Sequence, residues 1–293
     1  MGTINNEEGN SSLNILFDNI RWEEKSIIEN AKKNDIDLKA IDCRELVLFL
    51  NCENKEFENK VILQRCVGYF KSMHSTAALE GLGARLINPL YTSVMCGNKL
   101  FSHMELQKQG IATPNAFCSF STSSAIEGIK KFGYPVVIKP TVGSWGRLIG
   151  LLNDEEAVKT VLEDREHMFP IYHVNYLEEF VKRPPRDIRA IVVGDQIVAA
   201  IYRYSGNNEW KTNMALGGRA ELCPVTKELE DICLTAAKIF KADVVGVDLM
   251  ESINHGLVVH EVNNTTEFKN TVRVTGVDIP SLIVNHMVNI LKK

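Results

Sequence analysis

The seven cysteines of this 293-residue sequence are widely spread, and none forms a Cys-x-x-Cys pair. Their odd number and spacing indicate neither a disulfide framework nor a zinc site. No apolar run approaches the roughly 18 residues that a membrane span needs. Positive charge is not in excess either, because 33 Lys and Arg face 37 Asp and Glu, for a net charge of -4. These absences argue against a membrane-spanning protein and against one that coats nucleic acid or an anionic membrane.

The standard nucleotide and catalytic motifs are also missing. There is no Gly-x-x-x-x-Gly-Lys-Ser/Thr, no Gly-x-Ser-x-Gly and no His-Glu-x-x-His, and Gly81-Leu82-Gly83 lacks the third glycine of the dinucleotide motif. What remains is an ordinary globular composition, 45% hydrophobic and 24% charged, in a chain long enough to bury a core without covalent links. We expect a cytoplasmic enzyme of mixed helix and sheet.

The pattern of apolar residues divides the chain into four parts. Residues 1–12 are a polar leader that we expect to be disordered, and residues 13–112 alternate short apolar runs with amphipathic stretches, as βαβ units do. Residues 113–182 have the pattern of a small α+β unit. Residues 183–293 begin with a hairpin, continue with two apolar strands and close with a helix. The predicted fold class is therefore α/β (α+β), with an N-terminal βαβ domain.

A candidate phosphate-binding element lies in the middle of the chain. Lys139 ends the apolar run Val136–Lys139, so its ammonium group would emerge from a dry environment at a strand end. The Gly-rich loop Val142–Arg147 follows, and it could surround polyphosphate oxygens with backbone N–H groups and a guanidinium. The alternative is an ordinary hairpin loop beside a solvent-exposed lysine, and a lone Gly-rich loop does not distinguish the two.

A candidate metal site comes from two apolar segments near the C-terminus. Asp248 lies within Val244–Met250, while Glu261 and Asn263 end the segment Leu257–Asn263. If the two segments are adjacent strands, alternation places Glu261 and Asn263 on one face, where Asp248 can join them. Oxygen ligands without His or Cys suit Mg²⁺, and acidic groups within apolar strands are costly unless paired or metal-bound. The alternative is three polar residues at strand edges that face solvent.

Basic residues gather in one part of this acidic chain. Local positive charge there suits an anionic ligand better than a nucleic-acid groove, although any single member could be an exposed surface side chain. The members are Arg186, Arg189, Arg203, Lys211 and Arg219.

A series of short motifs gives the chain a family resemblance. In order, they are Asn98-Lys99, Val137–Pro140, Gly143–Arg147, Glu178–Val181, Arg186–Arg189, Ala200–Arg203, Asn213 with Gly217-Gly218, Asp248, and Glu261–Asn263. In these residues the chain resembles the RimK-like branch of the ATP-grasp carboxylate–amine ligases. The resemblance implies an ATP-grasp fold with a pre-ATP-grasp domain at residues 13–112. Residues 113–182 would then be a small lid subdomain, and residues 183–293 the ATP-grasp domain with the metal site.

Within this branch the chain is similar to the LysX/ArgX ligases, mainly through Glu261–Asn270, Val274–Pro280 and the loop Gly143–Arg147. Such enzymes use ATP to join the amino group of an acidic amino acid to the C-terminal glutamate side chain of the acidic carrier protein LysW, through an acyl-phosphate. Asn264-Thr265 matches the pair that marks the 2-aminoadipate enzymes of lysine biosynthesis. Glutamate, used in arginine biosynthesis, or both amino acids are the alternatives.

The resemblance also implies roles for single residues. The ATP contacts would be Lys99, Lys139, Gly143, Ser144, Trp145, Gly146, Arg147, Glu178, Glu179, Phe180, Val181, Asp187, Arg189, Arg203 and Asn213. The metal ligands, for two Mg²⁺ ions, would be Asp248, Glu261 and Asn263. The amino-acid contacts would be Asn264, Thr265, Gly217 and Gly218. Lys139 and Arg203 would be catalytic, because they neutralise the charge that accumulates when a carboxylate attacks the γ-phosphate.

The expected partners are a LysW-type acidic carrier, a small acidic amino acid and further copies of the chain in a dimer or tetramer, without nucleic acid or membrane. Two other functions stay open. A RimK-type ligase would add glutamate to the tail of another protein. A non-catalytic regulator would bind ATP without substrate-dependent release of ADP.

Overall fold

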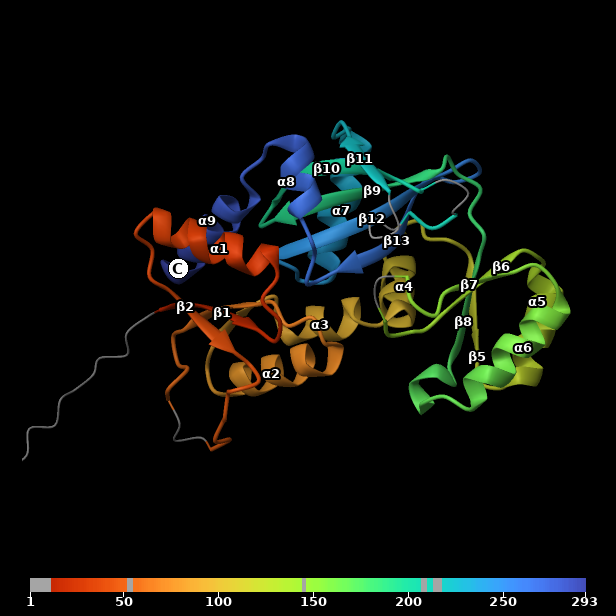
Figure 1. Ribbon diagram of the computed structural model, residues 1–293, viewed down its shortest axis with the longest axis horizontal. Helices are drawn as coiled ribbons and strands as arrows, with labels where there is room; N and C mark the ends of the chain where they lie inside the picture. The colour runs from red at the N-terminus through yellow and green to blue at the C-terminus, as the bar shows by residue number, and fades with distance from the viewer. Residues whose placement is uncertain (1–11, 52–54, 144–145, 207–209, 213–217) are drawn as a thin grey trace, which may run out of the picture.

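The computed structural model describes residues 12–51, 55–143, 146–206, 210–212 and 218–293. The strands in these residues form three sheets, one in each of the N-terminal, middle and C-terminal parts of the chain (Figure 1). The mixed content of helix and sheet agrees with the predicted fold class.

The N-terminal sheet is parallel, with the strand order β2-β1-β3-β4. Its strands are β1 (Leu13–Phe17), β2 (Leu38–Asp42), β3 (Val61–Gln64) and β4 (Arg85–Ile87). Helices α1 (Trp22–Lys33) and α9 (Ile279–Leu291) pack against one face, and α2 (Tyr69–Gly81) packs against the other. Because both faces are covered, β1 and β3 are buried along their whole length and are mostly apolar, with Asn14 and Gln64 as their polar members.

The C-terminal helix completes the core of the N-terminal sheet. Ile279, Ile283 and Met287 of α9 are fully buried in the same cluster as Leu13 and Ile15 of β1. Figure 1 shows α1 and α9 side by side, although they lie at opposite ends of the chain. Packed side chains, more than the connecting chain, therefore hold the N-terminal sheet against the rest of the molecule.

The middle sheet is antiparallel, with the order β5-β8-β6-β7. Its strands are β5 (Ala116–Ser119), β6 (Val136–Lys139), β7 (Gly150–Leu152) and β8 (Asn175–Glu179), and a short 3₁₀ helix, Pro170–Tyr172, precedes β8. Helices α5 (Thr122–Phe132) and α6 (Glu155–Glu166) bury their apolar faces against the sheet. Ser121 and Asp154 cap these helices by accepting hydrogen bonds from backbone N–H groups of the first turn.

The central sheet is antiparallel, with the order β11-β10-β9-β12-β13. Its strands are β9 (Arg186–Val193), β10 (Gln196–Tyr204), β11 (Arg219–Leu222), β12 (Val244–Ser252) and β13 (Gly256–Asn263). Helix α7 (Lys227–Ile239) covers one face, where Ile188 and Ala190 of β9 are buried. Alternation turns Asp187 and Arg189 toward the opposite face.

Three short helices connect these layers: α3 (Leu90–Cys96), α4 (Lys99–Lys108) and α8 (Lys269–Thr275). The side chain of Asn98 caps α4 by accepting hydrogen bonds from Leu100 and Phe101. Among the described residues, no single helix is long and apolar enough to cross a membrane. Only α8 and α9 together reach that length and composition, and a bend of 114° separates them.

Candidate active site

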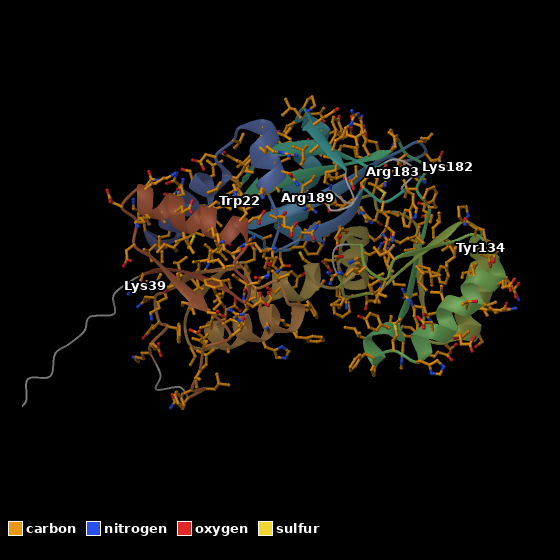
Figure 2. All side chains as sticks on the ribbon, in the orientation of Figure 1. Trp22, Lys39, Tyr134, Lys182, Arg183 and Arg189 are labelled. Atoms are coloured by element: carbon orange, nitrogen blue, oxygen red, sulfur yellow. The ribbon has the colours of Figure 1, made fainter. Side chains whose placement is uncertain are left out.

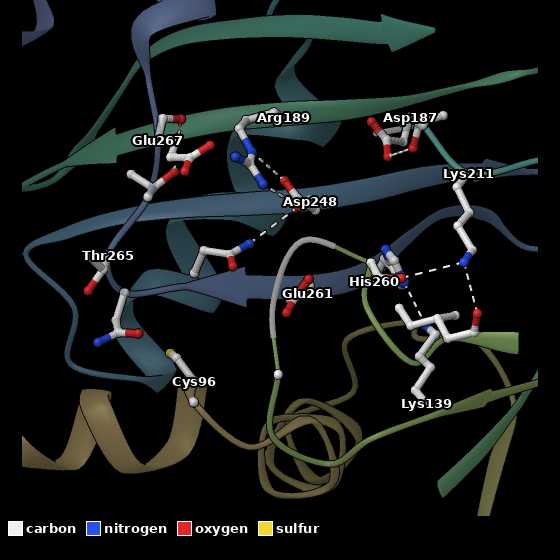
Figure 3. Close-up of a pocket in the computed structure, with 18 of the residues that line it drawn as sticks. Cys96, Lys139, Asp187, Arg189, Lys211, Asp248, His260, Glu261, Thr265 and Glu267 are labelled. Carbon is white, nitrogen blue, oxygen red and sulfur yellow. Dashed lines mark hydrogen bonds and ion pairs between the residues drawn. The ribbon is translucent and has the colours of Figure 1, made fainter. Parts of the chain in front are cut away.

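A cavity of about 880 Å³ has walls from all three sheets. The N-terminal sheet contributes the segment after β3, the middle sheet contributes β6 and β8, and the central sheet contributes β9, β10, β12 and β13. Figure 3 shows Lys139 and Lys211 on one side of Asp248 and Glu261, and Thr265 and Glu267 on the other. Most of the described residues of the predicted site therefore lie along one continuous cavity.

Lys139 is buried at the end of β6, with only 3% of its surface exposed. Its ammonium group donates a hydrogen bond to the carboxylate of Glu178, and its Nζ lies 2.6 Å from Nε2 of His260. Burial, together with the nearby charge of Lys139, holds the pKa of His260 well below its usual value. The neutral imidazole can therefore accept a hydrogen bond from the lysine. The alternative of a solvent-exposed lysine beside a hairpin is wrong.

His260 is a site residue that the sequence pattern did not identify. Simple alternation places it on the opposite face of β13 from Glu261. The register between β12 and β13 shifts after the pair Asp248 and Glu261, so that His260 is an extra residue in β13. Such a bulge redirects side chains, and here both His260 and Glu261 line the cavity.

The three predicted metal ligands come together on neighbouring strands. Asp248 of β12 lies directly opposite Glu261 of β13, and Nδ2 of Asn263 lies 3.3 Å from a carboxylate oxygen of Asp248. Asp248 is 3% exposed, so it does not face solvent at a strand edge. Carboxylate and amide oxygens are the donors that Mg²⁺ prefers, and the three side chains fit this ion.

Basic side chains neutralise these carboxylates. Arg189 donates two hydrogen bonds to Asp248, at 2.8 and 2.7 Å, and Lys99 donates one to Glu261 at 3.0 Å. Burial alone would raise the pKa of Asp248, but the charges of Arg189 and Arg203 outweigh it and hold this pKa well below the usual range. Asp248 is therefore ionised, as a metal ligand must be.

Arg203 of β10 bridges two carboxylates. Its guanidinium donates to Asp187 at 2.7 and 2.9 Å and lies 3.1 Å from Asp248, and the hydroxyl of Thr212 also donates to Asp187. Burial alone would lower the pKa of Arg203. The negative charges of Asp187 and Asp248 have the larger effect and raise this pKa above its usual value. The guanidinium is thus a permanent positive charge between two acidic groups.

The five predicted basic residues do not all reach this site. Arg189, Arg203 and Lys211 line the cavity, and Lys211 donates to the backbone oxygen of Ile149 at 2.8 Å. Arg186 and Arg219 do not line the cavity, because alternation turns Arg186 to the other face of β9, and Arg219 is exposed at the edge strand β11.

Arg186 has its own partners on that other face. It donates to Glu251 at 2.6 and 2.9 Å, and its guanidinium lies 3.8 Å from the ring centre of Tyr202. These contacts hold strands β9, β10 and β12 together, away from the cavity.

The segment Glu178–Val181 lines the cavity as a mixed polar and apolar wall. Glu179 accepts a hydrogen bond from the backbone N–H of Asn115 at 2.8 Å, and the ring of Phe180 packs edge-on against Trp210 at 6.0 Å. Apolar neighbours in the same wall are Val137, Ile149, Ile201 and Met250. An apolar wall beside backbone and carboxylate groups can accept a flat heteroaromatic ring.

The Gly-rich loop is described only in part, because Ser144 and Trp145 lie outside the described residues. Gly143 and Gly146 have φ angles of +155° and +67°, and Lys99 donates to the backbone oxygen of Gly143 at 2.8 Å. Asn213 and Gly217 also lie outside the described residues. Lys99, Arg147 and Gly218 are described but do not line the cavity formed by the described residues.

The segment after β13 forms the wall on the N-terminal side. Asn264 and Thr265 line the cavity there, as do Cys66 and Ser93. The side chain of Thr265 donates to the backbone oxygen of Cys66 at 3.4 Å, and Nδ2 of Asn264 lies 3.5 Å from Oγ of Ser93. Two of the four residues predicted to contact the amino acid therefore lie next to the N-terminal sheet.

Comparison with known proteins shows the family of the chain. Residues 96–287 match the RimK-like ATP-grasp domain, and residues 13–94 match the LysX preATP-grasp domain. An alpha-aminoadipate–LysW ligase LysX of Sulfurisphaera tokodaii is 35% identical over 96% of this chain and 99% of its own length. A glutamate–LysW ligase ArgX of Sulfolobus acidocaldarius is 30% identical over 94% of this chain and 97% of its own length.

Solved structures share the fold at low identity. A RimK domain ATP-grasp protein from Sphaerobacter thermophilus superposes with a TM-score of 0.73 and 17% identity, over 94% of this chain and 99% of its own. Fold and cavity together define an ATP-dependent ligase of the ATP-grasp class, a class that uses ATP and Mg²⁺. The chain belongs to the RimK-like ATP-grasp family and carries a LysX-type pre-ATP-grasp domain. The fold and the family resemblance predicted from the sequence are confirmed.

Proposed function

We propose that this enzyme joins the amino group of 2-aminoadipate to the C-terminal glutamate side chain of a LysW-type carrier protein, in lysine biosynthesis and in the cytoplasm. The observation that carries the proposal is the cavity itself, in which cationic groups and a set of oxygen donors lie between the middle sheet and the segment Asn264-Thr265. The near full-length similarity to LysX enzymes supports the choice of substrate.

The wall made by the middle and central sheets would hold ATP. Phe180, Val181 and Met250 would contact adenine, and Lys139 would contact the phosphates from its buried position between Glu178 and His260. Asp248, Glu261 and Asn263 would hold two Mg²⁺ ions, which supply charge neutralisation for phosphoryl transfer.

Arg203 and Lys139 would act in the step that activates the carrier. When the carrier carboxylate approaches the γ-phosphate, two anions come together, and fixed positive charges lower the barrier most where that charge accumulates. Arg203 is held by Asp187 and Asp248, so it needs little reorganisation before the reaction. The acyl-phosphate that results would be protected from water by the loop Gly143–Arg147 until the amine attacks.

The amino acid would bind beside Asn264 and Thr265, with Gly217 and Gly218 supplied by the segment before β11. The acidic carrier would approach the open side of the cavity near its basic residues, and its association should weaken with added salt. We also infer a homo-oligomer, a dimer or tetramer.

The test is the intact mass of a purified LysW carrier after incubation with this enzyme, Mg·ATP and equal amounts of 2-aminoadipate and glutamate. An increment of the size of 2-aminoadipate is the expected result. A glutamate-sized increment would move the enzyme to arginine biosynthesis, and both increments would mean dual use. No increment, with the protein folded and ATP bound, would contradict the proposal and favour another acceptor or a regulatory protein. Reactions without ATP serve as the control.

A further inference from the structure

The segment 264–269, which lines the cavity after β13, is held by residues from the N-terminal part of the chain. The side chain of Asn88 donates to the backbone oxygen of Asn264 at 3.1 Å, and Nη2 of Arg65 donates to that of Thr266 at 3.0 Å. A carboxylate oxygen of Glu23 accepts hydrogen bonds from the backbone N–H groups of Phe268 and Lys269, at 3.1 and 3.0 Å. One end of the cavity is thus shaped by residues from the N-terminal part of the chain.

Arg65 is the most constrained of these anchors. It follows β3 directly, is 1% exposed, and forms an ion pair with Glu24 at 2.9 Å. Its guanidinium also lies 5.8 Å from the ring centre of Phe268. A buried arginine is tolerated only when its charge and its hydrogen-bond donors have partners. The planar guanidinium of Arg65 has two, the carboxylate of Glu24 and the backbone oxygen of Thr266.

Arg65 does not line the cavity, so it acts through the residues that it holds. We propose that Arg65 is a positioning residue for amino-acid binding, because its guanidinium, oriented by Glu24, fixes the carbonyl of Thr266 and with it Asn264 and Thr265 at the cavity wall. This inference rests on the proposed function, in which Asn264 and Thr265 contact the amino acid.

A matched arginine lies at the other end of the cavity. Arg165 of α6 is 4% exposed, and it donates to the backbone oxygens of Lys139 at 3.3 Å and Leu148 at 2.9 Å. Both arginines are buried and both hold backbone carbonyls beside the cavity. Arg65 holds the segment after β13, and Arg165 holds the end of β6. A general loss of stability would affect both variants alike, whereas a local effect would change the binding of a different substrate in each.

The experiment compares Arg65→Met, Arg65→Lys and Arg165→Met in steady-state ligation of 2-aminoadipate to the carrier. A displacement of about 1 Å in a binding group can cost up to roughly 100-fold. We therefore expect both Arg65 variants to raise the KM for the amino acid by roughly 10- to 100-fold and to leave the KM for ATP within about threefold of wild type. Arg165→Met should instead raise the KM for ATP and leave the KM for the amino acid within about threefold of wild type.

Arg65→Lys is the decisive variant, because lysine retains the ion pair with Glu24 but has no fork to reach Thr266 as well. Its melting temperature should stay near that of wild type while the amino-acid KM rises. An unchanged amino-acid KM in Arg65→Lys and Arg65→Met, or equal changes in both KM values, would overturn the positioning role.

A second measurement does not depend on the proposed function. Amide hydrogen exchange of the free protein should become faster at residues 264–270 in Arg65→Met and stay unchanged there in Arg165→Met. Equal protection of this segment in wild type and Arg65→Met would refute the role of Arg65. A wild-type enzyme that does not ligate 2-aminoadipate, but shows faster exchange in Arg65→Met, would refute the proposed substrate and retain the anchor.

Discussion

The imidazole Nε2 of His260 lies 2.6 Å from the ammonium group of Lys139, although 121 residues separate them in the sequence. Figure 2 shows the side chains on the three sheets, with Arg189 labelled in the central sheet. The neutral imidazole is one of two partners that orient Lys139, and the other is the carboxylate of Glu178. Lys139 is therefore held in the free protein by one neutral and one charged partner.

Loss of the His260 imidazole should weaken ATP binding. A hydrogen bond to a charged group contributes about 1.5–3 kcal/mol, so His260→Leu should raise the KM for ATP by roughly 10- to 100-fold. His260→Gln keeps an acceptor oxygen and should lose less. His255→Gln, an exposed histidine in the same β12–β13 hairpin, is the control. Wild-type ATP kinetics in His260→Leu would contradict the orienting role.

Arg203 should matter more for turnover than for ATP affinity. Its guanidinium is held between Asp187 and Asp248, where negative charge would develop during phosphoryl transfer. Removing one such group costs roughly 100- to 1,000-fold in turnover, and we expect Arg203→Ala to show that loss in kcat. Steady-state kinetics with ATP varied separates the two parameters. Arg219→Ala, on the neighbouring edge strand, is the control, and equal losses in kcat and ATP affinity for Arg203→Ala would argue against this role.

The oxygen donors predict a dependence on Mg²⁺. Asp248→Asn and Glu261→Gln keep the size of each side chain but remove the negative charge that a hard cation needs. We expect ligation to fall by about 100-fold or more, and ATP binding measured by calorimetry to lose its dependence on Mg²⁺. Cooperative unfolding by urea shows whether the fold is retained. Full turnover in either variant would exclude the metal assignment.

The buried carboxylate of Glu24 should make stability depend on pH. Burial raises the pKa of Glu24, but the charges and hydrogen bonds of Arg21 and Arg65 outweigh this and lower it from 4.5 to about 2. Because the folded-state pKa is the lower one, the stabilisation is present above pH 4.5 and is lost as the pH falls toward 2. At about 1.4 kcal/mol per pKa unit, the lowering of the Glu24 pKa corresponds to roughly 3 kcal/mol of folding stability at neutral pH.

Urea unfolding between pH 7 and pH 2.5 measures this effect. Glu24→Gln should be less stable than wild type at pH 7 and should lose less stability on acidification. Glu29→Gln, at an exposed position of the same helix, should behave like wild type. Parallel curves for wild type and Glu24→Gln would mean that the ion pairs of Glu24 do not stabilise the fold.

Gly246 allows the segment after β13 to lie directly on β12. A Cβ atom at this position would come within 2.2 Å of Oγ1 of Thr266, so Gly246→Ala must displace Thr266. Overpacking of this kind costs about 1–3 kcal/mol, and we expect a lower melting temperature and a higher KM for the amino acid. Gly81→Ala has no atom within 4 Å of the added carbon and serves as the control. An unchanged amino-acid KM in Gly246→Ala would show that the position of Thr266 does not affect amino-acid binding.

Local sequence pattern was enough for much of the fold. The apolar run at β6 and the two apolar segments that form β12 and β13 follow from hydrophobicity over a few residues, whereas the pairing of β12 with β13 was only a condition of the predicted metal site. Helix α2 was not predicted, because the residues that it buries include Ser72 and Thr76. Polar residues on a buried face conceal the period of 3.6 on which such predictions depend.

The sequence by itself determined which chemistry the protein carries: the lysine at a strand end, the three oxygen donors, the Gly-rich loop and the order of motifs that marks the family. Only the tertiary structure decided which groups meet. The bulge that turns His260 toward Lys139 and the contact of Arg65 with Thr266 join residues 121 and 201 positions apart. Such contacts depend on how sheets and helices pack against one another. The sequence pattern around each residue specifies its own helix or strand but does not specify which distant residue it meets.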